Sequence, residues 1–151
     1  MVNLLNKEGI TMIQLIVGDK GKGKTKHLLD KVNASVKTTS GNIVYLDKST
    51  KHMYELKNRI RLINVAEYPI SSQGEFVGFI CGIVSQDHDL EQVYFDSFRD
   101  IAHIKEDAEI EDVLMKLDKI SEQFKVDFII SVCLGTLDLP EYLQSKVIVS
   151  L

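Results

Sequence analysis

The stretch LIVGDKGKGKT at residues 15–25 constrains the fold of this chain more than any other part of the sequence. The apolar run before the loop, MIQLIV at 12–17, is typical of a buried strand, and the residues after the loop have the spacing of a helix. Between them, Gly18, Gly21 and Gly23 allow backbone N–H groups to converge on an anion without obstruction from a Cβ atom. The helix would direct its unpaired N–H groups and its dipole to the same point. This strand, loop and helix therefore predict a cradle for phosphate groups.

Residues 18–25 match the pattern G-x-x-x-x-G-K-[ST] at every position. In a loop of this kind Lys24 would reach the β- and γ-phosphates of a nucleotide, and the Thr25 hydroxyl would hold Mg²⁺. We include Lys22 and Lys26 among the candidate contacts to the nucleotide. For Lys22, an ordinary solvent-exposed charge is the alternative.

Short apolar runs alternate with longer helical patterns along the rest of the chain. Strands are predicted at 12–17, 43–46, 59–65, 92–96, 127–132 and 146–150, and helices at 24–37, 72–86 and 106–125. This alternation predicts an α/β fold with a mostly parallel sheet of about five strands and helices on both faces. The carboxyl ends of the strands would then carry the functional loops.

From Met12 onward the chain resembles the P-loop NTPases, which implies their three-layer α/β fold. In that superfamily an Asp at the end of a hydrophobic strand holds the metal through water, and VYFD, ending in Asp96, fits this Walker-B pattern. At least one strand, IVYL at 43–46, lies between the loop and Asp96, as in the division that contains RecA-like, AAA-type and secretion ATPases. Ser131 lies where that division has a residue that senses the γ-phosphate; a buried Ser bonded to the backbone is the alternative.

The stretches LIVGDKGKGKTKHLL and GNIVYLDKST are also similar to thymidine kinases and to small ATP-binding proteins of unassigned role. The chain lacks the paired cysteines of the thymidine-kinase zinc lasso, and twitching-motility ATPases are a looser likeness because their extra domain has no room here. GTP is disfavoured because no N-K-x-D motif occurs. The resemblance implies an Mg²⁺-dependent ATP-binding protein that acts as a slow ATPase or a nucleotide-dependent switch. A nucleoside or small-molecule kinase and a non-hydrolysing regulatory ATP-binding module are the alternatives.

The group that would orient an attacking water is not the usual one, because Ser97 follows Asp96 where hydrolytic members have a Glu. Asp47, which closes the strand IVYL, is the preferred substitute, and Glu67 is the other candidate. Arg99 lies close to the loops expected to frame the γ-phosphate, where it would stabilise the transition state; a solvated loop charge is the alternative. The four histidines show no metal-ligand spacing.

Composition narrows the choice of partners. The net charge is −4 and no segment concentrates Lys or Arg, so we expect no nucleic-acid partner. No apolar stretch has the length of a membrane span, so we expect no membrane partner either. Two cysteines in apolar contexts, without a secretory signal, predict a cytoplasmic protein.

Gly74, Gly78 and Gly82 recur at every fourth position of the helix at 72–86, which is apolar enough to be mostly buried. Three glycines cost roughly 2–3 kcal/mol in helix propensity against alanine, so close backbone approach must compensate. Tight packing on the sheet is one explanation. The other is a self-association face, so a homodimer or an unidentified protein partner stays open.

Residues 1–11 have no usable periodicity and form an N-terminal extension to a P-loop nucleotide-binding domain at 12–151. Lys7-Glu8-Gly9 can be encoded by a purine-rich run that resembles a bacterial ribosome-binding site, upstream of the Met12 codon. We therefore interpret Met12 as the natural start and 1–11 as a mis-called extension. A short disordered or strand-capping segment is the alternative.

Overall fold

The computed structural model describes residues 13–151, so the extension at 1–11 and the candidate start at Met12 lie outside the described residues. Within this range, six strands form one sheet: β1 (Ile13–Val17), β2 (Asn42–Asp47), β3 (Ile60–Asn64), β4 (Leu90–Phe95), β5 (Asp127–Val132) and β6 (Val147–Ser150). All neighbouring strands of this sheet are parallel. The predicted α/β sheet is confirmed, although the expected count of about five strands is one too few.

The helices connect the strands as parallel crossovers require. They are α2 (Lys24–Ser35), α3 (Gln73–Ser85), α4 (Phe98–Ile101), α5 (Ala108–Phe124) and α6 (Glu141–Gln144), with 3₁₀ turns η1 (Met53–Glu55), η2 (Val65–Glu67) and η3 (Thr136–Asp138). Each predicted strand and helix is present, with boundaries that differ by at most two residues over the described range. Within that range, no helix is both long and apolar enough to cross a membrane.

The strands lie in the order β3-β2-β4-β5-β1-β6. Strand β1 leads into the glycine loop and β4 leads into Asp96. In the sheet, β5 lies between these two strands. The strand IVYL, which is β2, lies between the loop and Asp96 along the chain, as predicted, but in the sheet it lies on the far side of β4. Order along the chain does not determine order in a sheet, because a crossover helix can return the chain on either side of a strand.

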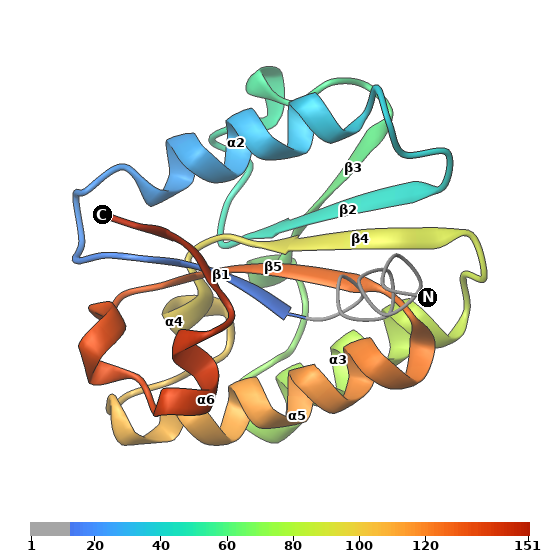
Figure 1. The fold of residues 1–151 in the computed structure, drawn as a ribbon. Coiled ribbons are helices and arrows are strands. Elements are labelled where there is room, and N and C mark those ends of the chain that lie inside the picture. The colour runs from blue at the N-terminus through green and yellow to red at the C-terminus, as the bar shows by residue number, and fades with distance from the viewer. Residues whose placement is uncertain (1–12) are drawn as a thin grey trace, which may run out of the picture.

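Alternate residues of each strand point to opposite faces of the sheet, and each face has its own core. On one face Leu28, Leu29 and Val32 of α2 pack with Ile16 and other strand residues. On the other face α3, α4, α5 and α6 cover the sheet and pack with residues such as Leu15. Figure 1 shows the resulting three layers, with α2 above the sheet and α3 and α5 below it. Each fully buried aliphatic side chain stabilises the fold by about 1.5–3 kcal/mol.

Helix α3 is less buried than its apolar sequence predicts. Only Phe76 and Ile80, with Val84 one turn further, are buried along it. Gly74, Gly78 and Gly82 are exposed, and a Cβ atom added at each would meet no other atom within 4 Å. Tight packing of these glycines on the sheet is therefore wrong, because the helix packs through the side opposite to them. The self-association face stays a prediction.

Candidate functional site

Several predicted site residues meet at the carboxyl edge of the sheet. The register pairs Phe95 of β4 with Leu46 of β2 and with Ile130 of β5. Asp47, Asp96 and Ser131, which each follow one of these residues, therefore lie side by side. A cavity of about 620 Å³ opens at this point, and its wall includes Gly21, Gly23, Lys24, Thr25, Asp47, Asp96, Arg99 and Ser131. The fold thus brings the glycine loop and both candidate aspartates into one cavity.

The glycine loop has backbone angles that side chains disfavour. Gly21 has φ = 85° and Gly23, which precedes α2, has φ = 94°. A Cβ atom at either position would meet nothing within 4 Å, so the requirement for glycine comes from the backbone angle and not from crowding. At Gly18 crowding matters, because a Cβ atom there would lie 3.0 Å from the Cβ of Leu151.

The Lys24 ammonium folds back over this loop. Its Nζ donates hydrogen bonds to the carbonyl oxygens of Gly18 at 2.7 Å and of Asp19 at 3.0 Å. An ammonium has three hydrogens, so one donor is left to face the cavity. Lys22 and Lys26 do not line the cavity; Lys26 instead pairs with Asp30 at 3.3 Å on the exposed side of α2.

A hydrogen bond joins the first turn of α2 to the end of β4. The Thr25 hydroxyl donates to Oδ1 of Asp96 at 3.0 Å, although the two residues are 71 positions apart. Asp96 is only 3% exposed, and its Oδ1 also accepts from the backbone N–H of Ser97 at 2.8 Å. Its Oδ2 accepts from the buried Tyr45 hydroxyl at 2.8 Å. Burial and the Asp96 charge raise the pKa of Tyr45, so the phenol stays a donor.

Asp47 is as buried as Asp96 but has fewer partners. Its Oδ1 accepts from the backbone N–H of Lys48 at 2.7 Å, and its Oδ2 is buried without a hydrogen-bond partner among the described residues. Burial, followed by the nearby Asp96 charge, raises the pKa of the Asp47 carboxyl. Glu67, the other candidate base, does not line this cavity. Of the two candidate bases, Asp47 therefore lies in the cavity with the glycine loop and Glu67 does not.

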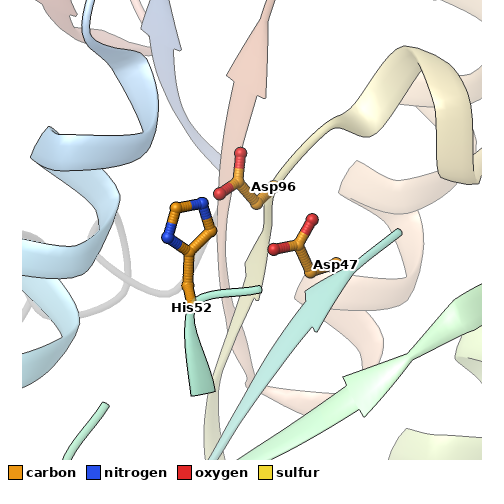
Figure 2. Close-up of side chains that lie close together, drawn as sticks. All are labelled: Asp47, His52 and Asp96. Atoms are coloured by element: carbon orange, nitrogen blue, oxygen red, sulfur yellow. The ribbon is translucent and has the colours of Figure 1, made fainter. Parts of the chain in front are cut away.

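His52 belongs to this site and was missed by sequence reasoning. One ligand atom from each of Asp47, His52 and Asp96 lies within 4.8 Å of the others, and Figure 2 shows the imidazole and the two carboxylates facing one another. The four histidines have no metal-ligand spacing in the sequence, and His52 has no acidic residue within two positions on either side. The sequence does hold one signal for His52. It lies five residues after Asp47, which ends a predicted strand, so its segment must start at the carboxyl edge of the sheet.

Ser131 and Arg99 line the cavity but already have partners. The Ser131 hydroxyl is buried and donates to the carbonyl oxygen of Phe95 at 3.1 Å. This is the bond to the backbone that is the alternative to γ-phosphate sensing. The Arg99 guanidinium pairs with Asp107 and donates to the Lys105 carbonyl oxygen at 2.6 Å. The hydrogen bond to Asp107 raises the pKa of Arg99. Both assignments to catalysis or nucleotide contact stay predictions.

Cations outnumber carboxylates around the cavity. Lys20, Lys24, Lys48, Lys51 and Arg99 line it, against Asp47, Asp96 and Asp100. Some of the positive charge is locally paired, since Lys48 donates to Asp100 at 2.9 Å. The excess of positive charge favours a polyanionic ligand over a neutral one.

No protein-family model matches the chain, and no curated protein is significantly similar to it. Its structure is similar to the crystal structure of a KaiC-like protein from the hyperthermophilic archaeon Pyrococcus horikoshii, with a TM-score of 0.60 and 19% sequence identity. The similarity covers 81% of this chain, but the chain spans only 62% of the length of that protein. At this identity the likeness shows the fold alone. The chain has the predicted three-layer α/β fold with a parallel sheet, and the KaiC-like protein has a similar fold.

Proposed function

We propose that the protein binds ATP with Mg²⁺ in this cavity and hydrolyses it slowly, as an ATPase or a nucleotide-dependent switch. The hydrogen bond from the Thr25 hydroxyl to Asp96 carries the proposal. It connects the end of the glycine loop to the carboxylate of β4 across the sheet. A basic surface turn that matched the loop pattern by chance would have no reason to meet a buried carboxylate.

The donor set fits a magnesium ion. Because the Thr25 hydroxyl gives its hydrogen to Asp96, its oxygen lone pairs are left for a cation. Oxygen ligands with retained water are what Mg²⁺ prefers, and Asp96 supplies negative charge beside them. When bound, the ion would neutralise charge on the phosphates. Thr25 would hold it directly, and Asp96 would act through Thr25 and through water.

The loop and its lysine fit the phosphates. The first turn of α2 leaves N–H groups without helical partners, and these lie beside the glycine loop. Lys24 would contribute its free hydrogen to a phosphate oxygen, while its two bonds to loop carbonyls hold it in place. The excess of lysines around the cavity would attract the polyanion.

Hydrolysis would use Asp47. As water forms a bond to the γ-phosphorus, the bond from that phosphorus to the bridging oxygen of ADP breaks, and the water proton moves to Oδ2 of Asp47. That oxygen is buried, has no hydrogen-bond partner within residues 13–151 and belongs to a carboxyl with a raised pKa, which suits a proton acceptor. Arg99 pairs with Asp107, so charge stabilisation by an arginine would require that pair to open.

Calorimetric titration of Mg-ATP into the wild-type protein and a Lys24→Ala variant tests this proposal. We expect the variant to lose about 10- to 100-fold in affinity, because a charge-assisted hydrogen bond to phosphate is worth about 1.5–3 kcal/mol. Lys26→Ala is the matched control, since Lys26 is an exposed neighbour outside the cavity. Equal ATP affinity in Lys24→Ala and wild type, with unchanged circular dichroism, would contradict the proposal. Product analysis with added nucleosides separates hydrolysis to ADP and phosphate from phosphorylation of an acceptor.

A further inference from the structure

Asp47, His52 and Asp96 converge from two neighbouring segments of the carboxyl edge. Asp47 ends β2, His52 follows it in the segment that leads to η1, and Asp96 follows β4. Their side chains lie together in Figure 2, with ligand atoms within 4.8 Å of one another. Both aspartates are 3% exposed. The nucleotide proposal gives roles to both carboxylates but none to the imidazole of His52.

Each of the three side chains keeps at least one acceptor lone pair. Oδ2 of Asp47 has no hydrogen-bond partner among the described residues. Asp96 accepts two hydrogen bonds at Oδ1 and one at Oδ2, which leaves one of its four lone-pair sites, on Oδ2. The Nδ1 of His52 lies 2.5 Å from Oε2 of Glu55, so the ring nitrogen left for the cavity is Nε2.

We propose that Asp47, His52 and Asp96 form a binding site for a divalent transition-metal ion of the Mn²⁺, Co²⁺ and Zn²⁺ class, which the protein binds without nucleotide. Imidazole is a ligand that these ions accept readily, whereas Mg²⁺ prefers an all-oxygen octahedron and keeps its water. One imidazole with two carboxylates therefore selects the transition metals. The site shares Asp47 and Asp96 with the nucleotide proposal, but it uses neither the glycine loop nor Thr25, so the ion needs no nucleotide to bind.

The surroundings of the three ligands match those of a metal site. Ligands about 2.1 Å from an ion lie within about 4.2 Å of one another, so small side-chain rotations bring these three onto one centre. Glu55 holds the far side of the imidazole, and the Tyr45 hydroxyl holds Asp96, in the way that outer carboxylates and donors orient metal ligands. A cation there would also neutralise two buried carboxylates that repel each other.

The test is a titration of the nucleotide-free full chain with Co²⁺, without Mg²⁺ and without a polyhistidine tag, followed by the visible absorption of the bound ion. We expect one ion per chain. His52→Ala should weaken Co²⁺ binding at least about 10-fold, and Glu55→Gln should weaken it by about 10–100-fold through the imidazole orientation. His88→Ala, which changes an exposed histidine outside the cluster, is the control and should bind Co²⁺ as wild type does.

Absence of Co²⁺ binding by the wild-type protein would overturn the proposal, and so would unchanged binding by a folded His52→Ala variant. His52→Asn serves as a second variant if the alanine variant does not fold. Lys24→Ala separates this proposal from the nucleotide site, because it should lose ATP affinity and keep Co²⁺ affinity. If Lys24→Ala loses both ATP affinity and Co²⁺ affinity, the metal binds together with the glycine loop, and the proposal of a site that needs no nucleotide is wrong.

Discussion

Replacing Asp47 with Asn should stabilise the protein. In the wild type the Asp47 carboxylate is buried, and one of its oxygens has no partner in the part of the chain that the structure describes. The Asp96 carboxylate lies within the same small cluster. An asparagine keeps the oxygen that accepts from the backbone N–H of Lys48 and replaces the unpartnered oxygen with a donor. Asp96 lies in the same cluster and has a free lone pair that can accept from this donor.

The magnitude follows from the unpartnered oxygen. A buried polar group without a hydrogen bond costs about 1–3 kcal/mol, so the free energy of unfolding should rise by about that amount. For a domain of this size, 1 kcal/mol corresponds to about 2–4 °C in Tm. Differential scanning calorimetry in EDTA, without nucleotide, measures the shift without a contribution from bound ligands.

The effect should depend on pH. Because folding raises the pKa of Asp47 above its ordinary value of 3.8, the native state binds a proton that the unfolded state releases in the window above about pH 4. The wild type therefore gains stability from this group as pH falls through that window, and Asn at position 47 does not. The Tm difference should be largest near pH 8 and should shrink toward pH 4.

Asp96→Asn is the matched comparison. It removes a carboxylate of equal burial that accepts three hydrogen bonds, so it should not stabilise the protein. An unchanged or lower Tm for Asp47→Asn at pH 8 would refute the reasoning. A Tm difference that grows as pH falls would show that the sign of the pKa shift is wrong.

The remaining predictions concern the catalytic groups. Phosphate release by the isolated protein should be far below the ~10 s⁻¹ median of enzymes, because Arg99 pairs with Asp107 and Ser97 stands where a water-orienting Glu is usual. Fast hydrolysis that survives Asp47→Asn would contradict both the slow rate and the assignment of Asp47 as the base. If a neighbouring chain supplies an arginine, turnover per chain rises with protein concentration, and Arg99→Ala abolishes the rise. Ser131→Ala should cost about 1 kcal/mol in stability and leave turnover unchanged, because its hydroxyl already donates to a backbone carbonyl; lost turnover at unchanged ATP affinity would instead indicate γ-phosphate sensing.

Local patterns were enough to predict the elements and the glycine loop. Buried strands, helical spacing and glycines before Lys24 are signals carried by neighbouring residues, and the structure has each of these elements. Asp96 was predictable for the same reason, because a strand of known direction ends directly before it. The carboxyl edge of a parallel sheet then brings such strand ends together.

Three features depended on tertiary placement and could not be read from local patterns. The position of β5 between β1 and β4 is set by how crossovers return to the sheet. The exposure of Gly78 depends on which side of α3 meets the sheet, and an apolar helix does not reveal that side. His52 lies in a segment without periodicity, and only the fold shows that it faces Asp47 and Asp96.

Backbone strain gathers at the same edge as the unpartnered oxygen. Among the described residues, three that are not glycine have positive φ. Two of them, His103 and Lys125, lie just after helices, where this is usual. Ser97 differs, because it lies between Asp96 and the start of α4, with φ = 53°, at a cost of about 1–2 kcal/mol. In this conformation its N–H bonds to Asp96. A glycine in place of Ser97 and a neutral side chain in place of Asp47 would each make the folded state more stable. The carboxyl edge therefore carries two unfavourable features, and both involve carboxylates that line the cavity, which is the usual distribution of strain at functional sites.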